Sequence, residues 1–183
     1  MRPSLGEVSV ALYGAWRLMR FDPNGLNYFD STAEAFWKSF YAAIICLPGI
    51  AIVMLTTGSS EASLHAIISN CSAYLAGWLV LAVVVHGICD AIGQQAKFIG
   101  CIVAINWSNV LQTYLILPIA FLRSFEGTPG LWTIMFLGAL LFMLVYEGYV
   151  FSRSLEISGL AAAGLVAVDF MISLLLKSIV NSP

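Results

Sequence analysis

Two acidic residues, Glu147 and Asp169, lie within apolar segments that are long enough to cross a membrane. An isolated acid in the hydrocarbon layer of a bilayer costs about 3 kcal/mol or more, so such residues face protein or water and find polar partners on other helices. Acids in this position bind cations or relay protons. We therefore expect both side chains to turn inward and to influence how the other helices pack.

Further polar residues occur at helical spacing in two other apolar segments. His86 and Asp90 lie four residues apart on one helix face, where they could relay protons, hold a metal or form a structural hydrogen bond. Amide side chains within a membrane either bond neighbouring helices together or line a polar path. We predict one polar cluster, formed by His86, Asp90, Asn106, Asn109, Gln112, Glu147 and Asp169.

The composition is that of an integral membrane protein. Of the 183 residues, 60% are hydrophobic and 10% are charged, and the mean hydropathy is +0.91. Soluble domains contain only about 45–50% apolar residues. The eight Lys and Arg residues are scattered singly, which argues against a nucleic acid partner.

No nucleotide-binding, serine hydrolase or zinc peptidase motif occurs in the sequence, so we expect neither a cofactor nor an enzyme. The cysteines follow no metal-binding spacing. We expect them to be small packing residues rather than metal ligands or disulfides; they are Cys46, Cys71, Cys89 and Cys101.

Five apolar segments predict an all-α, polytopic helical bundle, with membrane spans at about 36–57, 64–89, 98–122, 130–152 and 158–180. These spans form a transmembrane domain over residues 31–183. A capping box at Ser31-Thr32-Ala33-Glu34 is expected to open the first span. Thr128 is expected to cap the fourth span. Pro48-Gly49 predicts a kink in the first span, and Pro118 predicts a bend in the third.

The amphipathic segment over residues 1–30 precedes the bundle. Its apolar residues recur at helical spacing from Leu5 to Arg20, which predicts a helix lying on the membrane surface or against the ends of the bundle. The order Asp22-Pro23-Asn24-Gly25 predicts a type I turn after it. Aromatic and basic side chains suit the lipid interface, and we expect Trp16, Arg17, Arg20, Trp37 and Lys38 to lie there.

Small residues at four-residue intervals allow helices to pack closely. Ala73 and Gly77 form one such pair in the second span. Gly159, Ala163 and Ala167 form a longer strip in the fifth span. We predict that both are helix-packing surfaces.

The distribution of basic residues predicts the orientation. Six of the eight Lys and Arg residues fall on the side of the N-terminus if five spans are threaded. Because cytoplasmic loops are enriched in these residues, we expect a cytoplasmic N-terminus and an outer C-terminus, in an inner or plasma membrane.

The order of elements, an amphipathic N-terminus followed by five spans, resembles the Yip-like family of membrane proteins. Leu12-Tyr13-Gly14-Ala15-Trp16 resembles the Leu-Tyr-Gly-Pro element of that family, with Ala15 in place of proline, and Gly148-Tyr149 resembles its Gly-Tyr pair. The resemblance implies a non-enzymatic role in membrane organisation or trafficking.

Three functions remain open from the sequence. The first is a subunit, assembly factor or scaffold that contacts membrane lipid and forms a homo-oligomer or a larger membrane complex. The second is a small transporter or channel whose cation or proton path is lined by Glu147, Asp169, His86 and Asn106. The third is an interfacial lipid-modifying enzyme that uses His86 and Asp90.

Overall fold

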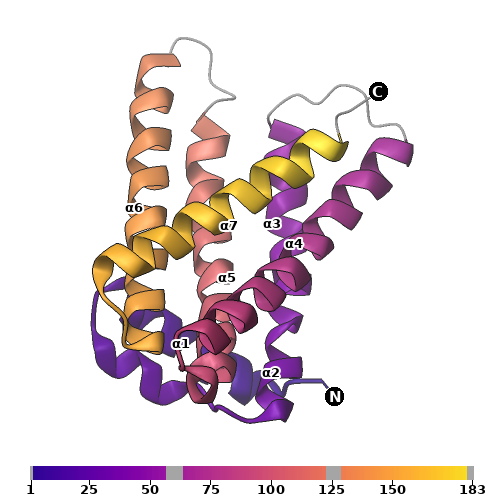
Figure 1. The fold of residues 1–183 in the computed structure, drawn as a ribbon. Coiled ribbons are helices and arrows are strands. Elements are labelled where there is room, and N and C mark those ends of the chain that lie inside the picture. Colours follow the sequence, from indigo (N-terminus) through magenta and orange to yellow (C-terminus); the bar gives the residue numbers. More distant parts are fainter. Residues whose placement is uncertain (1, 57–63, 123–128, 181–183) are drawn as a thin grey trace.

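The structure, a computed structural model, describes residues 2–56, 64–122 and 129–180. Within these ranges the chain is helical and contains no strand (Figure 1). Five segments are long and apolar enough to cross a membrane, namely Ala33–Val53, Ser72–Ala91, Gln95–Leu122, Gly130–Leu155 and Gly159–Ile179. The predicted fold class, a helical membrane bundle, is confirmed.

Seven α-helices and two 3₁₀ helices follow one another in the described part of the chain. They are α1 (Leu5–Met19), η1 (Pro23–Tyr28), α2 (Ala33–Ser39), α3 (Tyr41–Thr56), α4 (Leu64–Ala91), η2 (Gln95–Lys97), α5 (Phe98–Leu122), α6 (Pro129–Leu155) and α7 (Gly159–Val180). Helices α1 and α2 lie at one end of the bundle, which we call the α1 end (Figure 1). The last turn of α7 lies at the opposite end, as an odd number of crossings requires.

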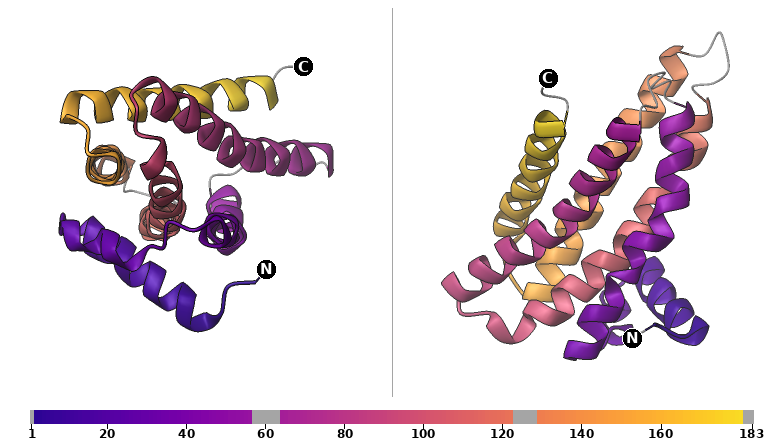
Figure 2. Two further views of the ribbon diagram at one scale, coloured as in Figure 1. Left: turned by 60° about the horizontal axis from the view of Figure 1, so that its bottom comes forward. Right: turned by 90° about the vertical axis from the view of Figure 1, so that its right-hand side faces the viewer.

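The helices form three layers, which Figure 2 shows in its left panel. The middle layer is the row of α3, α5 and α6, with α1 on one side and the pair of α4 and α7 on the other. Half of the α5 span is buried, against 17% of the α7 span, so α5 is the central helix and α7 is peripheral. The composition of α5 suits this position, because the helix contains no charged residue.

The N-terminal helix α1 packs against the bundle, which decides between the two positions expected for it. Ala15 and Leu18 are fully buried and Ala11 is nearly so, in the face that contacts α5 and α6. The apolar residues at helical spacing are Leu5, Val8, Leu12, Ala15, Trp16 and Met19. Of these, Leu5 and Trp16 are 87% and 49% exposed. The buried stripe is therefore offset by one position from the expected one.

Close backbone contact joins α1 to η1. A Cβ atom added at Gly25 would lie 2.6 Å from the carbonyl oxygen of Gly14 and 2.9 Å from the backbone nitrogen of Leu18. Arg17 in turn forms an ion pair with Asp22, and this hydrogen-bonded partner lowers the pKa of the Asp22 carboxyl. Glycine is thus required where the two segments meet, and the ion pair closes the corner between them.

The local signals between α1 and α3 agree with the structure in part. Gly25 donates its backbone N–H to the Asp22 carbonyl at 3.1 Å, which is the hydrogen bond of the expected turn, and the chain continues from it into η1. The first span begins with Thr32 as the N-cap, whose side chain accepts the Ala35 backbone N–H. The helix start was therefore predicted one residue early, and the Ser31–Glu34 capping box was wrong, because Ala35 at the third helical position has no side chain that could complete one. Pro48 lies inside α3, and the helical run of the first span is interrupted at Phe40, between α2 and α3.

A capping box that the sequence analysis overlooked opens α1. Ser4 Oγ accepts the Glu7 backbone N–H at 3.2 Å, and the Ser4 backbone N–H donates to Glu7 at 2.6 Å. Lys38 of α2 donates to the other Glu7 oxygen at 2.6 Å. The hydrogen bond from Lys38 and those from Ser4 lower the pKa of Glu7 to about 2.

We expect acid to remove the stabilisation that Glu7 provides. A carboxyl group whose pKa is lowered on folding stabilises the folded state above its unfolded pKa, here the ordinary 4.5, and loses that effect as the pH falls toward about 2. Thermal unfolding in detergent should therefore show a constant difference between wild type and Glu7→Gln above about pH 5. The difference should shrink between pH 4.5 and 2, and a difference independent of pH would contradict the assignment.

Of the two predicted small-residue surfaces, the structure places one between helices and the other outside. Gly77 of α4 lies against α7, where an added Cβ would come within 3.5 Å of Leu176 Cδ1. Gly159, Ala163 and Ala167 lie on the exposed face of α7, and the packed face is formed by Ala162, Leu165 and Val166. The longer strip therefore packs against no helix in the described part of the chain.

Candidate functional site

A cavity of about 680 Å³ lies between the middle layer and the α4–α7 pair, in the half of the bundle away from α1. It opens between these helices and has both polar and apolar walls. Its polar residues come from three helices and are Asn70, Asn106, Asn109, Gln112, Thr113, Asp169, Ser173 and Lys177. A polar cavity inside helices of this hydropathy has the properties of a binding site.

Helix α7 contributes the charged wall. Asp169, Ser173 and Lys177 recur every four residues, so they share one helix face and line the cavity together. The sequence analysis counted Lys177 only toward the orientation and did not consider Ser173. Their four-residue spacing from Asp169 was the sequence signal that could have identified Ser173 and Lys177 as wall residues.

Helix α5 contributes the amide wall, as its helical periodicity predicted. Asn106 is almost fully buried at the inner end and donates to Ser39 Oγ of α2 at 2.8 Å. Gln112 donates to the Asn109 side-chain oxygen at 3.4 Å. Asn106 thus bonds two helices together, while Asn109 and Gln112 face the cavity with only this long hydrogen bond between them.

Helix α4 contributes an aromatic pair, Tyr74 and Trp78, one turn apart. Their ring centroids lie 5.9 Å apart at an interplanar angle of 72°. The Tyr74 hydroxyl donates to the Ala43 carbonyl of α3 at 3.1 Å. This contact fixes α4 against α3 and holds both rings in the cavity wall.

The two acids meet between α6 and α7. Glu147 is 8% exposed, and its carboxyl group is a neighbour of the Asp169 carboxyl group. One of its oxygens, Oε1, is buried and has no hydrogen-bond partner among the described residues. Asp169 is partly buried and borders the cavity, so it stands between Glu147 and the open space. Both acids turn inward, as the cost of exposing an acid to lipid required.

His86 and Asp90 do not belong to this cluster. Their side chains are 58% and 52% exposed, and His86 Nδ1 lies 3.3 Å from Asp90 Oδ2. The His86 ring also packs edge-on against Phe98 at 5.0 Å between centroids. The structure does not bring the pair together with Glu147 and Asp169, because both side chains lie at the exposed surface of α4.

No group of three or more His, Cys, Asp or Glu side chains lies close enough to hold a metal ion within residues 2–56, 64–122 and 129–180. Cys46, Cys89 and Cys101 are buried and free of disulfides, as packing residues would be. The side chain of Cys71 lies outside the described part.

Tyr146, next to Glu147 in α6, connects the site to α1. Its hydroxyl donates to the Ala15 carbonyl at 2.9 Å and lies 2.7 Å from Ser108 Oγ of α5. The residue is fully buried. Because the Ala15 carbonyl accepts this hydrogen bond, α1 is bonded to the same segment of α6 that carries the buried Glu147.

Removing that hydroxyl should weaken the whole bundle. We expect Tyr146→Phe to reduce the free energy of unfolding by about 1–3 kcal/mol, because the buried carbonyl of Ala15 and hydroxyl of Ser108 each lose a partner. Tyr149→Phe is the matched control, since its hydroxyl donates to the Phe21 carbonyl at 2.7 Å in an exposed setting. Thermal unfolding in detergent measures both, and equal losses would contradict the assignment.

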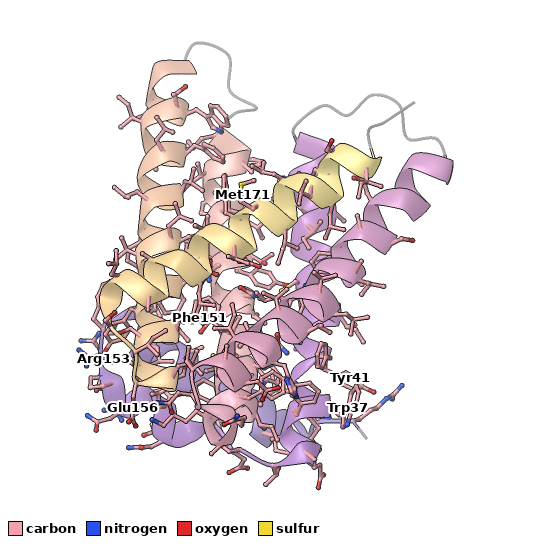
Figure 3. The ribbon with its side chains drawn as sticks, in the orientation of Figure 1. Trp37, Tyr41, Phe151, Arg153, Glu156 and Met171 are labelled. Carbon is pink, nitrogen blue, oxygen red and sulfur yellow. The ribbon has the colours of Figure 1, made fainter. Side chains whose placement is uncertain are left out.

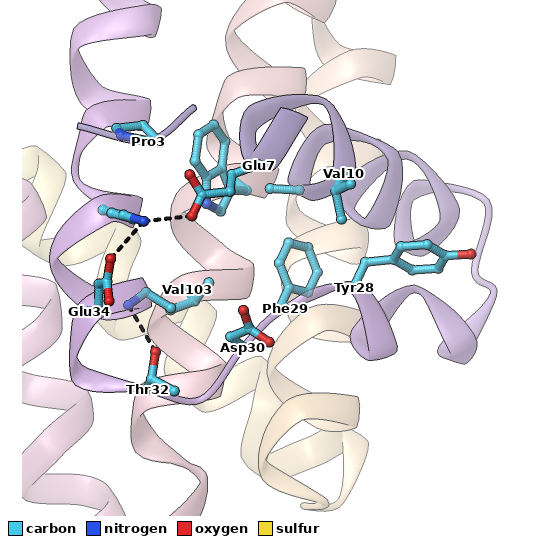
Figure 4. A pocket seen from close by; sticks show the side chains of 13 residues that line it. Pro3, Glu7, Val10, Tyr28, Phe29, Asp30, Thr32, Glu34 and Val103 are labelled. Atoms are coloured by element: carbon cyan, nitrogen blue, oxygen red, sulfur yellow. Dashed lines mark hydrogen bonds and ion pairs between the residues drawn. The ribbon is translucent and has the colours of Figure 1, made fainter. Parts of the chain in front are cut away.

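A second, smaller cavity of about 320 Å³ lies at the α1 end, between α1, α2 and α5 (Figure 4). Glu7, Asp30 and Glu34 stand around it, and Lys38 pairs with Glu7 at 2.6 Å and with Glu34 at 2.8 Å. The floor is apolar and includes Trp107. The charges are thus largely satisfied within the chain.

The residues expected at the lipid interface lie at the α1 end, but not all are turned outward. Trp16 and Trp37 are exposed, and Figure 3 shows Trp37 at the same end as Arg153 and Glu156. Arg20 is exposed as well. Arg17 and Lys38, by contrast, form ion pairs with Asp22 and Glu7 within the chain. The structure therefore turns these two side chains toward the protein and not toward lipid.

Comparisons with family models, with curated proteins and with solved structures find no match to this chain.

Proposed function

We propose that this protein binds and transports a small organic cation within the membrane. The observation that carries the proposal is the position of Asp169, which borders the cavity and is backed by Glu147. A carboxyl group inside a membrane domain is costly unless it has a partner, and a cation entering the cavity supplies one. This is the second of the three functions left open by the sequence, without His86.

The walls favour an organic cation over a bare metal ion. The cavity volume of about 680 Å³ falls within the range of small-molecule sites and far exceeds a single ion. Tyr74 and Trp78 offer aromatic faces, which attract ammonium groups. Lys177 shares the wall, but its Cα lies about 12 Å along the helix from that of Asp169. A cation beside Asp169 is therefore separated from the like charge.

We further propose that the N-terminus is cytoplasmic and the C-terminus outside. Five of the basic residues in the described part belong to α1 or to the ends of helices near it, namely Arg17, Arg20, Lys38, Lys97 and Arg153. This bias is the usual sign of a cytoplasmic face. In this orientation the cavity lies in the outer half of the membrane.

Tetraethylammonium is a suitable probe, because it is compact, permanently charged and slow to cross bilayers. We expect purified protein to bind it, and vesicles containing the protein to take up labelled tetraethylammonium faster than empty vesicles. N,N-diethylacetamide, which has a similar size and no charge, should not compete. The absence of both binding and uptake, or equal competition by the neutral compound, would refute the proposal.

A scaffold or subunit role is the second candidate, and the exposed face of α7 supports it. Gly159, Ala163 and Ala167 form a smooth strip that no helix of this chain covers. A helix from a second copy or from another membrane protein could pack there. Ala163→Leu should then dissociate the complex in mild detergent, while a wild type that is monomeric and captures no partner after cross-linking would exclude this role.

A further inference from the structure

We infer that the Glu147–Asp169 pair exchanges one proton for each cation that binds, so that the protein is a cation–proton exchanger. The inference rests on the proposed function and adds that cation transport is coupled to proton transport. It starts from the contact between the two carboxyl groups, not from the cavity alone.

The contact itself requires a proton. Glu147 and Asp169 are neighbours, and two adjacent carboxylates repel each other, so the pair is stable without a cation only when one of the two groups is protonated. Glu147 is more than nine-tenths buried, and its Oε1 atom has no partner among the described residues. Without a bound cation, the pair therefore holds one proton and one negative charge. The Oε1 atom of Glu147 can still accept a hydrogen bond.

The surrounding helices supply no other charge to balance a second carboxylate. Helix α5 contains no charged residue, and among the described residues that line the cavity Lys177 is the only other charged side chain. The neighbouring Tyr146 hydroxyl points to Ala15 and Ser108. Tyr74 is the other titratable residue in the wall, and its hydroxyl bonds to Ala43.

Elsewhere on the helices packed against the pair, the described charged groups are already engaged or lie apart from it. On α4, His86 and Asp90 pair with each other at the exposed surface. On α6, the Arg153 guanidinium lies 5.4 Å from the centre of the Tyr149 ring. On α1, Glu7 and Arg17 pair with Lys38 and Asp22. A second negative charge at the carboxyl pair is thus stabilised only by a cation in the cavity.

The exchange step balances in charge and atoms. A cation enters beside Asp169, the shared proton leaves through the cavity to water, and both carboxyl groups become carboxylates facing one positive charge. The reverse step returns one proton and releases the cation. No bond other than that of the carboxyl proton is formed or broken, and no co-reactant is needed.

The two acids have different parts in this step. Asp169 lines the cavity and contacts the cation, whereas Glu147 stands behind it and does not line the cavity. Glutamine in place of Glu147 can donate its amide N–H to Asp169, which then needs no proton. Glu147→Gln should therefore bind the cation without releasing a proton.

The test counts protons during binding. Tetraethylammonium carries no ionisable proton, so any proton released into a weakly buffered detergent solution at pH 7 comes from the protein. We expect about one proton per bound cation for the wild type and close to none for Glu147→Gln. Asp90→Asn, at a half-exposed acid that pairs with His86 outside the cavity lining, is the matched control and should keep the wild-type count.

The outcomes separate this inference from the proposed function. A wild type that binds tetraethylammonium without releasing protons would refute the exchange and leave the cation site in place. A wild type that does not bind it would refute both. If Glu147→Gln binds and still releases one proton, the pair is not the source. In vesicles, an imposed proton gradient should drive uptake several-fold in the wild type and leave uptake by Glu147→Gln unchanged.

Discussion

Asp169→Asn should reduce the affinity for tetraethylammonium at least tenfold and bring uptake into vesicles down to the rate of empty ones. The substitution keeps the shape of the side chain and removes the charge that faces the cavity. A tenfold loss corresponds to about 1.4 kcal/mol, a modest value for a charge pair shielded from water. We expect the fold to persist, because asparagine can still pair with Glu147.

Asp90→Asn is the matched control for this experiment. It makes the same chemical change at an acid that is half exposed and paired with His86, outside the cavity lining. Its binding and uptake should equal those of the wild type. If Asp90→Asn and Asp169→Asn were equally impaired, or if Asp169→Asn kept full affinity with an unchanged melting temperature, the cation site would be wrongly placed.

Gly25→Ala should detach α1 from the bundle. The new Cβ would lie 2.6 Å from the Gly14 carbonyl oxygen, 2.8 Å from Leu18 Cγ and 2.9 Å from the Leu18 backbone nitrogen. Two of these atoms belong to the backbone, so α1 and η1 must move apart. Overpacking of this kind costs about 1–3 kcal/mol, and the move also strains the Tyr146–Ala15 hydrogen bond.

Gly6→Ala tests whether the effect depends on the close approach. Gly6 lies in the same helix, and the nearest atom to an added Cβ is Ser4 Oγ at 3.9 Å. Alanine there should leave the melting temperature in detergent unchanged or raise it, because alanine is the better helix former. Protease cleavage after Arg17 or Arg20 should accelerate in Gly25→Ala only. Equal behaviour of the two variants would contradict the packing described at η1.

The sequence by itself determined the class of the protein and the course of its helices. Apolar runs of about 20 residues can satisfy their backbone only as helices in a membrane, so the five spans followed from composition and length. The start of α5 at Phe98 and its end at Leu122 agree with the predicted span. The inward position of Glu147 and Asp169 followed from the cost of exposing an acid to lipid.

Only the tertiary structure decided which polar residues belong together. Periodicity assigns a residue to a face of its own helix, but the partner of that face depends on tilt and crossing angle, which side-chain packing over the whole bundle sets. His86 therefore separated from Glu147, Lys177 joined Asp169 in one cavity wall, and the Gly159 strip turned outward. The meeting of Glu147 and Asp169, on which the proposed exchange depends, is a property of how α6 and α7 pack.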